Sequence, residues 1–113
     1  MADISVYDSR ADLWTSLELE LPAPWSYMDS VSHDNNVYII GGQWQQPDND
    51  NPNNVTLPRN LWCFDPNDMF LKKLSHMRQK RKFTCLVELN DDLYVLGGCS
   101  AARGGFWQSH NSV

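Results

Sequence analysis

The sequence predicts an all-β protein, and three observations support that prediction. Helical periodicity is nearly absent from the 113 residues, whereas short apolar runs recur. Turn-forming clusters of Asp, Asn, Pro and Gly separate these runs. The third observation is a repeat, because residues 35–43 read NNVYIIGGQ and residues 91–99 read DDLYVLGGC. A β-rich repeat of roughly 50 residues is typical of β-propeller blades.

We expect eight short strands in two sets of four antiparallel strands. The expected ranges are 4–8, 13–18, 27–33, 36–41, 60–65, 69–74, 83–89 and 92–97. Residues 34–36 and 90–92 would close a hairpin between the first and second strands of each set, because Asp and Asn favour tight turns. Residues 65–68 contain a proline that fixes φ, which predicts the turn between the third and fourth strands.

The two sets of strands align residue by residue. In the alignment, Tyr7 corresponds to Phe64 and Trp14 to Leu71, each 57 positions later. Tyr38 corresponds to Tyr94, 56 positions later. The second copy therefore lacks one residue, which falls between Leu74 and Met77. About two propeller blades are expected from this alignment.

Each repeated feature has a structural reason. The runs around Tyr38 and Tyr94 combine β-branched and aromatic residues, which suits strands that are buried on both faces. The glycines that follow allow positive φ and a close approach of neighbouring backbone. Trp14 is expected to pack its indole ring between blades. The structural residues predicted in this way are Gly41, Gly42, Gly97, Gly98, Trp14, Tyr38 and Tyr94.

Composition excludes several classes of protein. With 42% hydrophobic residues the chain can form a core, and 14 acidic against 9 basic residues disfavour binding to nucleic acid or an anionic membrane. The charge is uneven, since residues 1–58 hold nine acids and one base while 59–113 hold five acids and eight bases. No leader and no apolar run of membrane-spanning length is seen. Cys63, Cys85 and Cys99 form no CxxC pair, which favours reduced thiols in a cytoplasmic protein.

These features resemble kelch repeats, and in particular those of BTB-kelch (Kelch-like) proteins. The resemblance rests on the two diglycines, on VYDSRADLW at 6–14, and on MRQKRKFTCLVELNDDLYVLGG at 77–98, and it covers about residues 4–99. Two departures stand out: Leu71 occupies a position where the family has tryptophan, and Trp25 lies where Arg81 falls in the second repeat. The resemblance implies a kelch-type β-propeller fragment.

The expected organisation is one complete blade between two partial ones. Residues 1–26 would supply the third and fourth strands of a blade, 27–76 a complete repeat, and 77–99 the first and second strands of the next. Residues 100–113 match nothing in the first copy and are expected to be a tail outside the repeat. Because repeat units bury their flanks against neighbours, two repeats cannot close a ring. We therefore expect a fragment, a truncated isoform or a partial gene model.

The resemblance also implies a function in protein binding. It indicates the substrate-recognition propeller of an adaptor for a cullin-dependent ubiquitin ligase. Contact with the cullin is expected only through a BTB region that this chain lacks. The alternative is a cytoskeletal, actin-binding or scaffolding kelch protein without a role in ubiquitin transfer. In the family, partners bind a face built from loops, which correspond here to 22–26, 43–59 and 78–82.

Within these loops, charge and aromatic character single out six residues as partner-binding candidates. Residues 78–82 read RQKRK, and four cations in five positions suit acidic or phosphate groups, although a solvated loop is the alternative. Two tryptophans are placed in polar loops as interface anchors, although Trp25 would equally serve to cap the core. The candidates are Trp25, Trp44, Arg78, Lys80, Arg81 and Lys82.

Catalysis finds no support in the sequence. His33, His76 and His110 are scattered, and no spacing brings two of them together as metal ligands. No nucleophile motif and no phosphate-binding loop is present. An oxidase-like kelch enzyme is the third and weakest hypothesis, because fold alone implies no activity. We expect no catalytic residue, no metal and no cofactor.

Overall fold

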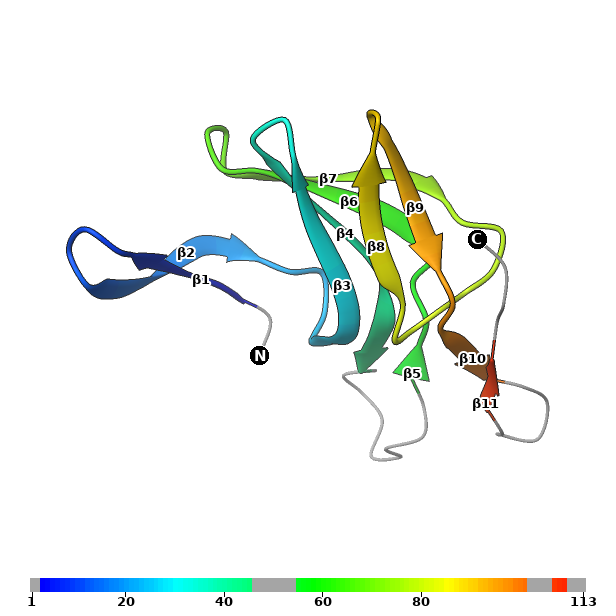
Figure 1. Ribbon diagram of the computed structural model, residues 1–113. Coiled ribbons are helices and arrows are strands. Elements are labelled where there is room, and N and C mark those ends of the chain that lie inside the picture. Colours follow the sequence, from blue (N-terminus) through cyan, green and yellow to red (C-terminus); the bar gives the residue numbers. More distant parts are fainter. Residues whose placement is uncertain (1–2, 46–54, 102–106, 110–113) are drawn as a thin grey trace.

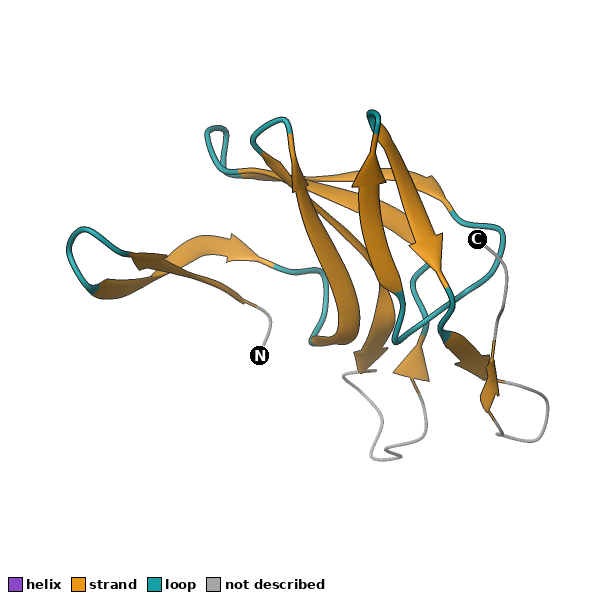
Figure 2. Cartoon of the chain, in the orientation of Figure 1, coloured by secondary structure: helices purple, strands orange, loops and turns teal. Residues whose placement is uncertain are grey.

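The computed structural model describes residues 3–45, 55–101 and 107–109, and this part of the chain contains strands and no helix (Figures 1 and 2). The all-β prediction is confirmed. No helix in the described part is long and apolar enough to cross a membrane. The strands are β1 (Asp3–Asp8), β2 (Leu13–Glu20), β3 (Trp25–His33), β4 (Asn36–Gln45), β5 (Val55–Thr56), β6 (Asn60–Asp65), β7 (Phe70–His76), β8 (Cys85–Leu89), β9 (Asp92–Leu96), β10 (Cys99–Ala101) and β11 (Trp107–Ser109).

The centre of the molecule is an antiparallel sheet in the order β3-β4-β6-β7, with β5 added beside the end of β4. Consecutive strands are neighbours, so the sheet is a meander of the kind that forms one propeller blade. Where β4 meets β6, Val37 pairs with Phe64, Tyr38 with Cys63 and Ile39 with Trp62. The sequence alignment missed β5, β10 and β11, which are two or three residues long and carry no alternating pattern.

Two further hairpins flank the blade. Hairpin β8–β9 stands beside it, with β8 next to β3, whereas hairpin β1–β2 extends away from the rest of the molecule on the other side (Figure 1). Backbone hydrogen bonds tie the segment that leads into hairpin β8–β9 to the blade: the Gly42 N–H donates to the Arg81 carbonyl (2.9 Å) and the Phe83 N–H to the Tyr27 carbonyl (3.1 Å). Hairpin β8–β9 is therefore docked on the blade.

The sequence repeat is also a repeat of backbone register. In β1–β2, Tyr7 pairs with Trp14, and in β6–β7 Phe64 pairs with Leu71, 57 positions later on both strands. Both hairpins also carry one register shift, and it falls at the equivalent place in each. Local sequence therefore gives these two hairpins the same backbone arrangement, although only one of them belongs to a complete sheet.

The other pair of hairpins repeats in the same way, because Val31 pairs with Tyr38 in β3–β4 and Val87 with Tyr94 in β8–β9. Residues with positive φ recur at equivalent positions too. Outside glycine they are Asp12, Tyr27, Asp34 and Asn35 in the first copy and Met69, Phe83, Asn90 and Asp91 in the second. Asn and Asp tolerate the left-handed region, which explains their presence in the turns.

The diglycine positions are spatially constrained. Gly42 has φ +86°, and a Cβ there would lie 2.5 Å from the Ser26 carbonyl oxygen. A Cβ on Gly41 would lie 2.9 Å from the Arg81 carbonyl oxygen. Residues larger than glycine would therefore displace both β3 and the segment that leads into hairpin β8–β9.

A cluster of tryptophans fills the end of the blade where β3 begins. The rings of Trp25 and Trp44 meet edge to face at 5.8 Å, and each lies 6.2 Å from Trp62. Such pairs add stability beyond the burial of apolar area. The buried apolar residues of the described chain are Trp25, Ile40, Leu57, Trp62, Phe64 and Leu86.

Trp14 does not pack between blades, and that expectation is wrong for this chain. Its side chain is 70% exposed and contacts Tyr7, with the ring centroids 5.2 Å apart. The physical reason is that, among the described residues, no other sheet lies beside hairpin β1–β2 (Figure 1).

Candidate functional site

The basic segment 78–82 connects β7 to β8, and its cations differ in their surroundings. Arg78 and Lys80 are exposed, whereas Arg81 and Lys82 are each only 5% exposed. Arg59 lies beside the exposed pair, since its guanidinium Nη1 is 3.4 Å from the Arg78 carbonyl oxygen. The exposed residues Arg78 and Lys80, with the half-buried Arg59 beside them, therefore form a cationic surface.

Arg81 and Lys82 lie in the structure's interior, which corrects their expected placement on an exposed loop. Arg81 Nη1 donates to the Gly97 carbonyl (3.1 Å), and Lys82 Nζ donates to Gln43 Oε1 (2.9 Å). The Lys82 ammonium also lies over the rings of Tyr27 and Phe83, 5.3 and 5.1 Å from their centroids. Burial lowers the pKa of Lys82, with a smaller opposing effect from Cys99.

Trp25 lies at the start of β3 and is buried, so its expected place in a polar loop is wrong. Its indole Nε1 donates to the Gly41 carbonyl (2.8 Å). Arg81, 56 positions later, makes the equivalent bond to the carbonyl of Gly97. The first repeat thus has tryptophan where the second has arginine, but in both repeats the side chain donates a hydrogen bond to the carbonyl of the first glycine of the pair.

Trp44 is a half-buried residue of β4 and not a loop residue. Its contacts with Trp25 and Trp62 place it in the end of the blade core. The indole nitrogens of Trp44 and Trp62 are buried without a hydrogen-bond partner. Of the predicted loop 43–59, residues 46–54 lie outside the described part of the chain, so only the two ends of this loop are described.

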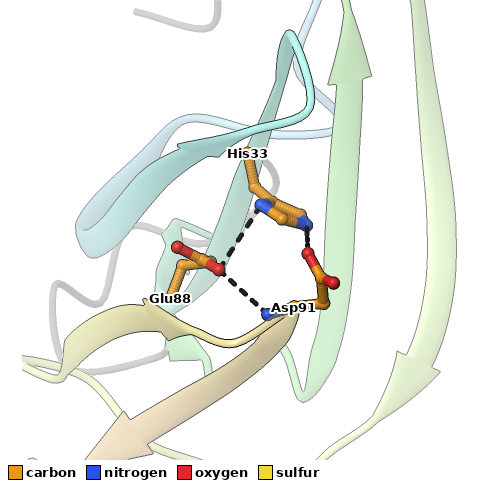
Figure 3. Close-up of side chains that lie close together, drawn as sticks. All are labelled: His33, Glu88 and Asp91. Atoms are coloured by element: carbon orange, nitrogen blue, oxygen red, sulfur yellow. Dashed lines mark hydrogen bonds and ion pairs between the residues drawn. The ribbon is translucent and has the colours of Figure 1, made fainter.

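Sequence reasoning missed a cluster in which His33 meets acidic residues of the next hairpin (Figure 3). His33 ends β3, and its Nδ1 lies 3.7 Å from Glu88 while its Nε2 lies 3.4 Å from Asp91. Asp34 also lies 3.3 Å from Nε2. Glu88 accepts a hydrogen bond from the Asp91 N–H (3.0 Å). The repeated turns at 34–36 and 90–92 were the signal, because equivalent turns of adjacent blades lie at the same end.

The geometry of this cluster suits an ion pair better than a metal site. His33, Glu88 and Asp91 bring ligand atoms within 4.8 Å of one another, but Glu88 and Asp91 approach opposite nitrogens of the ring. A single metal ion binds only one ring nitrogen, so the cluster would have to rearrange to bind one. Asp91 is also 87% exposed at its side chain. When protonated, His33 would instead form ion pairs with carboxylates on both sides of its ring and link the two turns.

Comparison with known proteins identifies the class to which this fold corresponds. The chain is 28% identical over 106 residues to Kelch-like protein 23 of Homo sapiens and 31% identical over 100 residues to Kelch-like protein 9 of Mus musculus. These matches cover 94% and 88% of the chain but only 16% and 15% of the relatives. An F-box/kelch-repeat protein of Arabidopsis thaliana is 32% identical over 94 residues, which are 79% of this chain and 21% of that protein. No family model matches the chain.

The repeated register and the all-β architecture, together with the similarity to kelch-repeat proteins, indicate a kelch-type β-propeller fragment with one four-stranded blade and adjoining hairpins. Within that class, the chain resembles the Kelch-like proteins over most of its length. The chain spans about a sixth of the length of these curated relatives.

Proposed function

We propose that this chain is part of a protein-interaction propeller, and that the whole protein is a substrate-recognition adaptor of a cullin-dependent ubiquitin ligase. The observation that supports this best is the similarity to two Kelch-like proteins across most of the chain. Kelch repeats serve as rigid carriers of binding loops, which agrees with a docked blade and hairpin whose connecting segment is cationic. The ligase assignment comes from the family resemblance.

We assign partner binding to the cationic surface of Arg59, Arg78 and Lys80. The last two are exposed and lie on the connection between β7 and β8, so they are accessible to an acidic or phosphorylated segment of a partner. The other four candidates, Trp25, Trp44, Arg81 and Lys82, make their contacts within the protein itself, and we propose that they position the loops rather than touch a partner.

A charge-reversal experiment tests this assignment. The longest gene product that contains this segment is tagged, and its bound proteins are quantified for the unchanged protein and for the Arg78→Glu/Lys80→Glu variant. We expect a specific set of partners to be lost at least tenfold. The matched control is Lys72→Glu/Lys73→Glu, which reverses two exposed charges on β7. Equal losses in both variants, or no loss in the first, would overturn the assignment.

The same purification tests the ligase proposal separately. We expect a cullin among the bound proteins, and we expect it to remain bound to the Arg78→Glu/Lys80→Glu variant because the cullin contact lies outside this segment. If no cullin is recovered and the protein co-sediments with filamentous actin, the alternative of a cytoskeletal or scaffolding kelch protein replaces the ligase proposal. Protein binding by the propeller would then stand, and only its cellular setting would change.

A further inference from the structure

The histidine cluster between hairpins β3–β4 and β8–β9 contains more carboxylates than its one cation can balance. Three acids lie within 3.3–3.7 Å of the ring nitrogens of His33, and they are Asp34, Glu88 and Asp91. No lysine or arginine of the described chain forms an ion pair with these acids. Even a protonated His33 therefore leaves two negative charges without a cationic partner, and a divalent cation would balance them.

The set of ligands that suits one ion includes Asp34 in place of Glu88. Asp34 and Asp91 both approach Nε2 of His33, with carboxylate oxygens 3.3 and 3.4 Å from it. Two ligands that each lie about 2.0–2.1 Å from a tetrahedral Zn²⁺ ion are about 3.3–3.4 Å apart. The two distances to Nε2 therefore match the spacing of ligands on such an ion, which would bind a single ring nitrogen.

Glu88 lies on the other side of the imidazole ring, where it would support the site without binding the ion (Figure 3). Its carboxylate is 3.7 Å from Nδ1 of His33 and accepts the Asp91 N–H at 3.0 Å. A histidine that binds a metal through one nitrogen commonly directs the other at a carboxylate, which fixes the tautomer and the ring orientation. Glu88 occupies the place of that carboxylate, and it also holds the turn that carries Asp91.

The fold alone does not account for a histidine at position 33. Its repeat equivalent, 56 positions later, is Leu89, which ends β8 as His33 ends β3. The acids of the two turns are different, because Asp34 and Asp91 have φ +50° and +69°, a region that aspartate tolerates. The His33 side chain is only 17% exposed and its ring lies 6.3 Å from that of Tyr38, so packing holds it in place. The two carboxylates, 81% and 87% exposed, are open to an ion from solvent.

We propose that Nε2 of His33, Asp34 and Asp91 bind a divalent transition-metal ion of the Zn²⁺ type, with Glu88 supporting the histidine at Nδ1. Three protein ligands leave a fourth position for water or for a group of a partner. The imidazole ligand favours Zn²⁺ over Mg²⁺ and Ca²⁺, which prefer oxygen ligands. A bound ion connects the turn after β3 to the turn after β8, so it stabilises the docking of hairpin β8–β9 on the blade.

Metal titration of matched variants tests the proposal. The longest gene product that contains this segment is stripped of metal with a chelator, and Zn²⁺ binding is measured by calorimetry at neutral pH. We expect His33→Gln to remove one equivalent of bound Zn²⁺, and Glu88→Gln to weaken binding at that site about tenfold. The controls are His76→Gln and Asp92→Asn, which change an exposed histidine elsewhere and the exposed acid next to Asp91. Both controls should bind as the unchanged protein does.

Thermal unfolding gives a second readout, because an ion that binds only the folded state raises the unfolding temperature. We expect Zn²⁺ to raise the midpoint of the unchanged protein more than Ca²⁺ does, and this difference should vanish in His33→Gln. Asp34→Asn, on an exposed turn, is a second variant that should lose the same equivalent of Zn²⁺. Circular dichroism shows whether each variant is folded.

Three outcomes would overturn the proposal. The first is no binding of Zn²⁺ by the unchanged protein. The second is binding that His33→Gln and Asp34→Asn retain in full, which would indicate an adventitious ion only. The third is an equal thermal shift with Ca²⁺, because attraction between an acidic surface and any divalent cation needs no histidine ligand.

Discussion

Hairpins β1–β2 and β6–β7 are the same structure in two settings. Their strand pairs coincide residue by residue, including the position of the register shift. Yet Phe64, whose strand β6 lies between β4 and β7, is buried, whereas the equivalent Tyr7 is half exposed. This difference shows that turns and side-chain alternation determine the strand register of the hairpin. Burial of its side chains depends on whether a neighbouring strand or sheet is present.

A second comparison concerns the first glycine of each diglycine pair. Trp25 supplies a side-chain donor to Gly41 in the complete blade, and Arg81 supplies one to Gly97 in the adjoining hairpin. The two side chains differ in shape and charge, but each donates a hydrogen bond to the carbonyl of the first glycine. The conserved element between these repeats is thus a hydrogen bond and not a residue type.

The largest effect is expected where the blade has no room for a side chain. Gly42→Ala places a Cβ 2.5 Å from the Ser26 carbonyl oxygen at φ +86°. We expect the free energy of unfolding to fall by about 3 kcal/mol. Urea unfolding followed by tryptophan fluorescence measures the change. Ser32→Ala on the exposed side of β3 is the control and should change stability by less than about 0.5 kcal/mol. Similar values for the two variants would contradict the packing of the diglycine.

Removing the indole donor tests the hydrogen-bond comparison. Trp25→Phe keeps an aromatic ring but leaves the buried Gly41 carbonyl without its partner, so we expect a loss of about 2 kcal/mol in unfolding free energy. Arg81→Met makes the equivalent change in the hairpin, with an expected loss of about 1 kcal/mol.

Trp14→Phe is the matched control for these donor variants, because Trp14 is exposed and contacts only Tyr7 among the described aromatic rings. Its unfolding midpoint in urea should stay within error of the unchanged chain. A loss as large as that of Trp25→Phe would show that hairpin β1–β2 is packed against another surface.

The contact between the blade and the second hairpin has a further test at Asp29. Its Oδ2 accepts the Leu86 N–H at 2.6 Å, which links β3 to β8. Asp29→Ala should destabilise the chain by about 1–2 kcal/mol and speed hydrogen exchange at the Leu86 amide. Asp29→Asn retains an acceptor and should restore much of the protection. Unchanged exchange at Leu86 in Asp29→Ala would exclude this bond as a link between the blades.

The smallest effect is expected at the histidine cluster. His33 reaches Glu88 and Asp91 across the two turns at the edge of the molecule, and such partly exposed ion pairs contribute little. We expect His33→Gln to cost about 0.5 kcal/mol in thermal unfolding. A double-mutant cycle with Glu88→Gln measures the coupling, which should be favourable and below about 1 kcal/mol. A coupling of zero would mean that the two turns are held together by backbone contacts alone.

The sequence by itself determined the strands, the turns and the repeat. Alternating apolar residues, Asp and Asn in the turns, and glycines at positive φ act within a few residues of one another, so their pattern can be read directly. The main errors in the elements were the short strands β5, β10 and β11, whose pairing involves too few residues to leave a pattern.

Only the tertiary structure decided which side chains are available to a partner. Trp25 and Arg81 look like exposed loop residues in the sequence, but both are buried. Trp25 packs on Trp44 and Trp62 in the end of the blade, and Arg81 binds the Gly97 carbonyl of the segment after β9. His33 and Glu88 are 55 positions apart, and no local spacing brings them together. Side-chain exposure and long-range contact follow from how whole hairpins dock, and that docking depends on backbone atoms such as the Arg81 carbonyl that every sequence possesses.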